Sequence, residues 1–557
     1  VSILLLFGLT GFALYYDGNV NKEYHTRKQR RTALNAADKK YKAFRQIVQP
    51  KIVDVRVEMD IYPASRNFKA KGSYQLVNLS DQAIDTLVIN YLAGNGVSYE
   101  MEKPNTIISA DKIADIGHFD IVQLEQALQP GDSLQMNFAC NPQNKERLPF
   151  GSLVKSNGTF IEDDVFPRLG NWLDYLRAEF EMGRRDDRPH PSDESAAYDS
   201  FMAKDADRVG FEAVVSTSGD QMAIAPGQLM KHWTDQGRNY YHYQMEEKIA
   251  LSYLFMSGDY AVAKDRWQDV ALEIYYDRKH PFNIEYMMQG LKDGLAYCSE
   301  NFSPYQHDHL RIVEFSQVGG ASAHGFPGTI PAGEGSGFIA DVDTSAAGGI
   351  NYAYGTAVHE TAHEWWGHQV LPANTLGSKM IVESMAEYVN SMVKKHKIGE
   401  AEARKFQRIN LSQYLSARGA DRRGESPLMY TYPNQNYIHY PKGSIVFYML
   451  AEYLGEDQLN AAIRNYVQKV AFQERKYTTS IEMVDSIRSA VPDSLQYLIK
   501  DWFETVTLYD NRMVEWTSTP LPDSRYELSI QFEVSKYRSE AYGTKRYSDN
   551  GRDSLQY

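Results

Sequence analysis

The sequence predicts a multidomain α+β protein, in which a mostly antiparallel β domain over residues 51–265 precedes a mainly helical domain over residues 266–510. Three observations support this fold class. A chain of 557 residues is too long for one hydrophobic core and predicts three or four domains. Apolar and polar residues alternate in the first half, which is the period of a half-buried strand. Helical spacing replaces this alternation from about residue 266.

The clearest strand signal opens the predicted β domain. The segment "IVDVRVEMDIYP" places one apolar face at every second residue: Val53, Val55, Val57, Met59 and Ile61. Further short segments of this kind, such as "DTLVINYL" and "DSLQMNFAC", continue to about residue 265. Residues 181–208 are instead charged and contain proline, so we expect them to leave the sheet as an excursion or loop.

The two ends of the sequence look cut. Residues 1–16 carry no charge but are fewer than the roughly 20 that a membrane-spanning helix needs, and no basic stretch precedes them as in a signal peptide. We expect the end of a truncated transmembrane helix, with Tyr15 and Tyr16 at the membrane interface; a buried helix is the alternative. Residues 17–50 are then a juxtamembrane helix or linker, and residues 511–557 the start of a truncated C-terminal β domain.

The composition argues against several classes of function. A net charge of −13 argues against nucleic acid as a partner, because phosphate binding favours a basic surface. The chain has no G-x-x-x-x-G-K-[ST] phosphate loop, so nothing suggests ATP hydrolysis. Cys140 and Cys298 could form a disulfide, but nothing in the sequence requires it, and the redox compartment stays open.

The segment "VHETAHEWWGH" holds the pattern of a zinc peptidase helix. His359 and His363 are four residues apart, so on a helix both imidazoles lie on one face and can bind one Zn²⁺ ion, with Glu360 beside them. A catalytic zinc site needs a third protein ligand and an open position for water. His368 is close in sequence, but on a continuing helix it lies roughly 140° around the axis from His363. We expect it to be a histidine that lies at the surface or that contacts a ligand residue rather than the metal.

Glu383 is the better candidate for the third ligand. It lies in "MIVESMAEYVNSMV", which predicts a second amphipathic helix that can pack against the first and present this carboxylate to the metal. Glu387 follows one turn later on the same face, where it can accept a hydrogen bond from a ligand histidine and fix its tautomer. The alternative is that both glutamates belong to a solvated face.

"HETAHEWWGHQV" followed by "VESMAEY" resembles the gluzincin zinc aminopeptidases, typified by membrane alanyl aminopeptidase and leukotriene hydrolase. That family places 18 residues between the second histidine and the glutamate, whereas this chain has 19, the spacing of thermolysin. We expect the loop "VLPANTLGSK" to absorb the additional residue. The resemblance covers about residues 51–510 and implies a thermolysin-like catalytic domain over residues 266–510, with one Zn²⁺ bound by His359, His363 and Glu383.

Two further segments resemble the family. "YIHYPKG" matches its Y-x-K-G segment, which implies that Tyr440 donates a hydrogen bond to the oxyanion; a packed aromatic residue is the alternative. "AGEGSGFI" can be aligned with the family's G-A-M-E-N, and only Glu334 carries over. In the family this glutamate binds the free α-amine of the substrate.

A narrower resemblance is to bacterial membrane proteins in which such a peptidase follows an ABC-transporter-type permease.

The combined prediction is a zinc metallopeptidase that removes N-terminal residues from peptides, with Glu360 as general base. The alternatives are a zinc endopeptidase or amide hydrolase without N-terminal preference, and a non-catalytic peptide-binding subunit of a membrane transporter. A structural zinc site is disfavoured because such sites have four ligands, usually with cysteine.

Expected partners are a peptide, the membrane through the N-terminal helix, and transporter subunits. Basic residues within 17–50 favour the cytoplasm, but large domains translocate regardless of flanking charge; we expect an extracytoplasmic peptidase domain.

Overall fold

The computed structural model describes most of the chain, which forms two compact units. The described residues are 2–16, 25–45, 47–142, 152–170, 172–173, 188–317, 323–340, 342, 349–422, 424–522, 525–539 and 545–547. The first unit comprises Val1–Asp187, Glu194–Asn374 and Val470–Thr478. The second comprises Arg188–Asp193, Thr375–Lys469 and Thr479–Tyr557.

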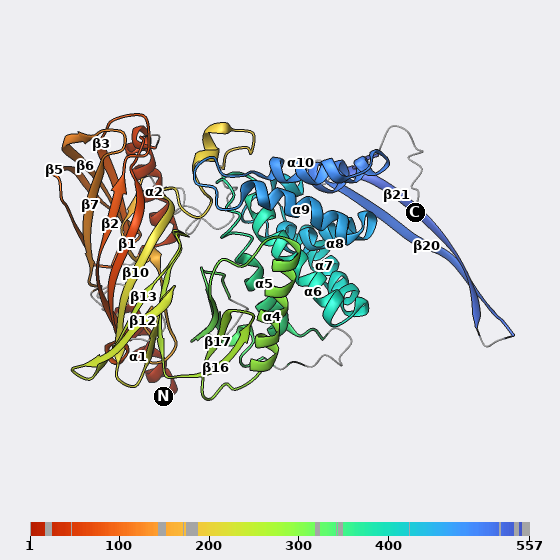
Figure 1. Cartoon of the computed structure of the whole chain (residues 1–557), viewed down its shortest axis with the longest axis horizontal. Coiled ribbons are helices and arrows are strands. Elements are labelled where there is room, and N and C mark those ends of the chain that lie inside the picture. Colours follow the sequence, from red (N-terminus) through yellow and green to blue (C-terminus); the bar gives the residue numbers. More distant parts are fainter. Residues whose placement is uncertain are drawn as a thin grey trace. The chain divides into compact units, whose positions relative to one another are not determined.

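An eight-stranded sheet is the largest element of the first unit (Figure 1). Its order is β12-β13-β10-β1-β2-β7-β4, with β14 paired to β10, and all pairs are antiparallel except β1 with β10. The strand bounds are β1 Lys51–Tyr62, β2 Asn67–Val77, β4 Val97–Met101, β7 Ser133–Cys140, β10 Ala206–Ser218, β12 Gln228–Asp235, β13 Arg238–Gln244 and β14 Ile249–Ala250. The mostly antiparallel β domain predicted from the alternation is confirmed.

Two smaller sheets complete this β-rich part. One has the order β5-β6-β3-β9 and the other β11-β15-β8. Their bounds are β3 Ile84–Leu92, β5 Asn105–Ile113, β6 Gly117–Leu128, β8 Thr159–Glu162, β9 Arg168–Leu169, β11 Met222–Ile224 and β15 Leu254–Gly258. Of the predicted excursion, residues 181–187 lie outside the described part, and residues 188–205 are irregular apart from the 3₁₀-helix η5 (Glu194–Tyr198) and one bridge at Ser200.

Helix α2 (Arg27–Lys40) packs on the sheet that contains β3, β5 and β6. Its Leu34 and Ala37 are buried in one cluster with Val88, Ile113 and Phe119. A capping box formed by Thr26 and Gln29 starts the helix. The segment predicted as a juxtamembrane helix or linker therefore contains a helix that belongs to the core of the β-rich part.

A four-stranded mixed sheet in the first unit lies mostly within the region predicted to be mainly helical. Its order is β16-β17-β18-β19, and its bounds are β16 Tyr260–Trp267, β17 Val270–Asp277, β18 His309–Phe315 and β19 Thr329–Gly333. Strands β18 and β19 are buried at every residue, so they lack the alternation that marks a half-exposed strand. Helix α4 (Ile284–Asn301) connects β17 to β18, and helix α5 (Tyr352–His363) follows β19.

The second unit is mainly helical, with a β hairpin at its end. Its principal helices are α6 Met385–Lys397, α7 Glu400–Ala420, α8 Gly443–Leu454, α9 Glu456–Val470, α10 Ser480–Ala490 and α11 Gln496–Ile499. Three π-helices interrupt this series: η7 Met380–Ser384, η9 Ile438–Lys442 and η11 Lys500–Glu504. The final strands are β20 Thr507–Pro520, β21 Tyr526–Ser539 and β22 Lys545–Tyr547. Helix content over 266–510 and a return to strand agree with the sequence prediction.

The N-terminal residues Ser2–Tyr16 form helix α1. Among the described residues, no helix is both long enough and apolar enough to cross a membrane. Cys140 and Cys298 are both buried and are not joined in a disulfide.

Candidate active site and metal centre

Helix α5 places the three residues of the predicted motif in its last two turns. The Asn351 side chain caps its first turn by accepting a hydrogen bond from the Tyr354 amide at 3.0 Å. The Tyr354 hydroxyl in turn donates to Asp293 of α4 at 2.8 Å, which fixes the two helices against each other. His359, Glu360 and His363 are then all buried, with exposed fractions of 8%, 6% and 8%.

The helix ends at His363 rather than continuing through His368. The chain turns at Gly367, which has a φ of +130°, and His368 is 4% exposed. Its Nε2 donates to the Gly325 carbonyl at 2.9 Å. The possibility of a surface histidine is therefore wrong, because the turn folds His368 back into the interior. It lies outside the group of candidate ligands formed by the described residues.

Glu364 and Arg208 anchor the segment that follows the helix, and the sequence analysis identified neither. The buried Glu364 carboxylate accepts hydrogen bonds from the Gly328 amide at 2.9 Å and from Gln306 Nε2 at 3.2 Å. Burial raises the pKa of Glu364 well above its usual value. Arg208 donates to the carbonyls of His368 at 2.6 Å and Gln369 at 3.1 Å. These partners lie far apart in sequence, so no local pattern indicates them.

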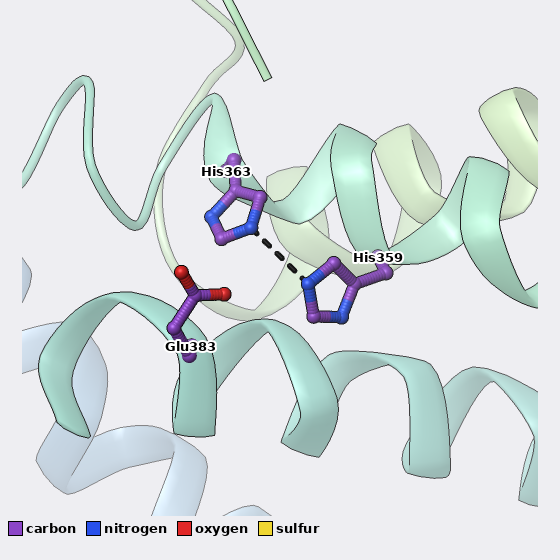
Figure 2. A group of neighbouring side chains, drawn as sticks. All are labelled: His359, His363 and Glu383. Atoms are coloured by element: carbon purple, nitrogen blue, oxygen red, sulfur yellow. Dashed lines mark hydrogen bonds between the residues drawn. The ribbon is translucent and has the colours of Figure 1, made fainter. Parts of the chain in front are cut away.

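The structure brings His359, His363 and Glu383 together. Each offers one ligand atom, and these atoms lie within 4.8 Å of one another. Figure 2 shows the two imidazoles projecting from one helix and the carboxylate from another, all toward a common point. The two Nε2 atoms are 3.2 Å apart. Two nitrogen ligands on tetrahedral Zn²⁺, at about 2.0–2.1 Å from the ion, are separated by about 3.3 Å. The three residues therefore fit a zinc ion.

Surrounding backbone fixes the orientation of His363. Its Nδ1 lies 3.0 Å from the Trp366 carbonyl, which can only accept, so Nδ1 carries the proton and Nε2 presents its lone pair. Gly325 passes close on the other side, where an added Cβ would lie 2.6 Å from the Cβ of His363. Only glycine at position 325 allows this packing against His363, and no sequence pattern indicated this requirement.

Glu383 lies in the π-helix η7 and is 5% exposed. Its Oε1 accepts a hydrogen bond from Lys379 Nζ at 2.9 Å. The additional residue before Glu383 was expected in the loop "VLPANTLGSK" after the first helix. A π-turn closes i→i+5 hydrogen bonds and so holds one residue more than an α-turn, and such turns are frequent at functional sites. The turn around Glu383 thus accommodates one more residue inside the helix itself.

Tyr440 lies in a second π-helix, η9, and is partly buried. Its ring contacts that of His439, with centroids 4.9 Å apart. Burial lowers the pKa of His439 to about 3, so this histidine is neutral at pH 7. Lys442, in the same turn, donates to Glu425 Oε1 at 2.6 Å. Glu425 also accepts from Arg418 Nε at 2.6 Å and from the Tyr414 hydroxyl. Tyr440 is thus carried by a turn that an internal ion pair holds.

The remaining two predicted residues occupy defined positions. Glu334 begins the 3₁₀-helix η6 (Glu334–Ser336) directly after β19, which is the edge strand of its sheet, and it is partly buried. Glu387 lies one turn after Glu383 in α6 and is also partly buried.

Residues 287–502 match the model of the peptidase family M1 domain. The chain contains a peptidase family M1 domain. No curated sequence gives a significant match. With the histidine–glutamate cluster, the family M1 domain identifies the chain as a zinc metallopeptidase. The predicted enzyme class and zinc cofactor are confirmed, and so is the resemblance at the level of this domain.

Several solved structures share the fold. An M1 zinc metallopeptidase from Deinococcus radiodurans is 12% identical and superposes with a TM-score of 0.56, covering 82% of this chain and 93% of that one. A mutant from Deinococcus radiodurans bound to a Tyr-Ser-Ala substrate is 13% identical, with a TM-score of 0.55 over 82% and 94% of the two chains. A two-domain M1 zinc metallopeptidase mutant bound to L-tryptophan is 12% identical with the same TM-score and coverage, 0.55, 82% and 94%. The predicted fold class, a β-rich domain followed by a helical one, is confirmed.

Proposed function

We propose that this M1 zinc metallopeptidase is an aminopeptidase that removes residues from the free N-terminus of peptides. The observation that carries the proposal is the convergence of His359, His363 and Glu383, with Glu360 in the same helix as the two histidines. Bound zinc would act there as a Lewis acid on the scissile carbonyl and would lower the pKa of water. The three ligands leave one tetrahedral position for that chemistry.

The other residues of the proposed mechanism belong to the chain itself. Glu360 takes the proton from the attacking water as general base and delivers it to the leaving amine as general acid. Tyr440 donates a hydrogen bond from its hydroxyl to the developing oxyanion. Glu387 orients a ligand histidine. These roles rest on the resemblance to the gluzincin family and on the elements that carry each residue.

The N-terminal preference rests on Glu334. It lies directly after β19 and is partly buried. Residues 323–326 pair with the outer edge of β19 through the bridges Ala323–Ala332 and Phe326–Thr329. A carboxylate at the end of this strand can bind the α-ammonium group and so set how many residues precede the scissile bond. The Tyr-Ser-Ala peptide and L-tryptophan bound to relatives of the same fold are consistent with short peptide substrates.

Membrane attachment remains a prediction from the sequence. The 16 uncharged N-terminal residues are what supports a membrane anchor, an extracytoplasmic peptidase domain and transporter subunits as partners. A preceding ABC-type permease rests on the narrower resemblance of the sequence.

The test is hydrolysis of two matched fluorogenic peptides, one with a free N-terminus and one acetylated. We expect cleavage of the free peptide alone, with activity lost in Glu360→Gln while zinc content is retained. Glu334→Ala should raise KM for the free peptide at least tenfold, whereas the matched change of the exposed Glu285 on α4 should have no effect. Equal cleavage of both peptides would point to an endopeptidase or amide hydrolase. Cleavage of neither, with zinc bound, would point to a peptide-binding subunit.

A further inference from the structure

We propose that Ser384 is a positioning residue, which joins the turn carrying the zinc ligand Glu383 to the turn carrying Tyr440 and so places the tyrosine hydroxyl for the reaction. This inference rests on the proposed function, in which Tyr440 binds the oxyanion. The structural basis is that Glu383 lies in the π-helix η7, Tyr440 lies in the π-helix η9, and the Ser384 side chain connects η7 to η9.

The connection is a buried hydrogen bond. Ser384 Oγ donates to the carbonyl oxygen of His439 at 2.7 Å, and the two residues are 0% and 1% exposed. Ser384 directly follows Glu383 in η7, and His439 directly precedes Tyr440 in η9. The bond therefore fixes the backbone next to both functional residues.

Gly443, the residue after η9, packs closely against Ser384 of η7. A Cβ added to Gly443 would lie 2.6 Å from the Cβ of Ser384 and closer still to its Oγ. Any side chain at Gly443 would push the turns apart. Ser384 is consequently confined between Gly443 and the His439 carbonyl, and its hydroxyl has one well-defined position.

The opposite end of η9 is held by a different contact. Lys442 is 7% exposed and bound to Glu425 at 2.6 Å, so η9 is fixed at His439 by Ser384 and at Lys442 by an ion pair. Tyr440 lies between these two points. A side chain held at both ends of its turn is preorganised, and a displacement of about 1 Å can cost about 100-fold in rate.

The experiment is a double-mutant cycle of Ser384→Ala and Tyr440→Phe in the zinc-loaded full chain. We expect Ser384→Ala to lower kcat about tenfold with little change in KM, and to have almost no further effect once Tyr440 is phenylalanine. Zinc content and zinc retention against a competing chelator should equal those of the wild type. Ser384→Cys, which keeps the volume and a weak donor, should be intermediate.

Matched controls separate this role from general stability. Ser391, also buried on α6, donates to the Glu387 carbonyl at 2.8 Å, and Ser391→Ala should leave kcat within about twofold at matched thermal stability. The proposal would be overturned if Ser384→Ala lowered kcat by the same factor in the wild type and in Tyr440→Phe. It would also be overturned if Ser384→Ala weakened zinc retention, because Ser384 would then act through Glu383. An unchanged kcat in Tyr440→Phe alone would instead refute the proposed role of Tyr440.

Discussion

Replacing Glu425 with glutamine tests how the turn that carries Tyr440 is held. Glu425 is buried, with its side chain 2% exposed, and accepts hydrogen bonds from Lys442, Arg418 and Tyr414. Burial and the nearby carboxylate raise the pKa of Tyr414. Glutamine keeps the shape of the side chain but removes its charge, so two cations would face a neutral amide.

The magnitude follows from the burial of each partner. The side chain of Lys442 is 9% exposed, and removing the partner of a buried charge costs about 3–5 kcal/mol. The Arg418 side chain is 26% exposed, so water offsets part of its loss, and glutamine still supplies one acceptor. We therefore expect about 3 kcal/mol, at the lower end of that range. For a domain of 150–250 residues this corresponds to a fall of about 6–12 °C in the unfolding midpoint.

The assay combines thermal unfolding with peptide hydrolysis at a temperature where the variant is folded. We expect kcat to fall together with stability, because Lys442 belongs to the same turn as Tyr440. Glu452→Gln is the control, since its ion pair with Lys395 is partly exposed and such pairs contribute about 0–1 kcal/mol. An unfolding midpoint and a kcat for Glu425→Gln equal to those of the wild type would refute the reasoning.

Three further predictions concern the metal, pH and the N-terminal helix. Glu383→Gln should lower zinc content well below one ion per chain by elemental analysis, because a neutral amide is a poor zinc ligand, whereas Glu285→Gln should not. Burial and the charge of Arg311 lower the pKa of His309 to about 4. The contribution of neutral His309 to the free energy of unfolding is therefore complete above about pH 6.5 and is lost as the pH falls toward 4. His309→Asn should flatten the pH dependence of the unfolding midpoint over that range, and an unchanged slope would contradict the prediction. Leu34→Ala removes a fully buried side chain at a cost of about 2–5 kcal/mol, and limited proteolysis should then cut within residues 25–45 faster than in Thr32→Ala, while peptidase activity is retained.

The strands and the motif helix were predictable because their signals are local. Alternating apolar residues from Val55 to Ile61 define the buried face of β1, and the spacing of His359 and His363 places both on one face of α5. Val53 was expected on the same face of β1, but a register irregularity between Ile52 and Asp54 buries Ile52 in its place. Strands β18 and β19 were missed because complete burial removes the alternation by which a strand is recognised. His368 is not a candidate metal ligand, as expected, but it is buried rather than at the surface, because the chain turns at Gly367 and His368 donates to the Gly325 carbonyl.

By itself, the sequence determined the residue types of a zinc site, their helical spacing and the β-rich character of the first half. These properties depend on residues that are close in sequence. Side chains three or four positions apart share a face of a helix, and side chains two positions apart share a face of a strand. Only the tertiary structure decided that Glu383 and Tyr440 lie in π-turns, that Ser384 bonds to the His439 carbonyl and that Lys442 pairs with Glu425. These contacts join residues from 17 to 55 positions apart. Such a partner is chosen by packing, which brings distant segments within hydrogen-bond distance and excludes the water that would otherwise satisfy them.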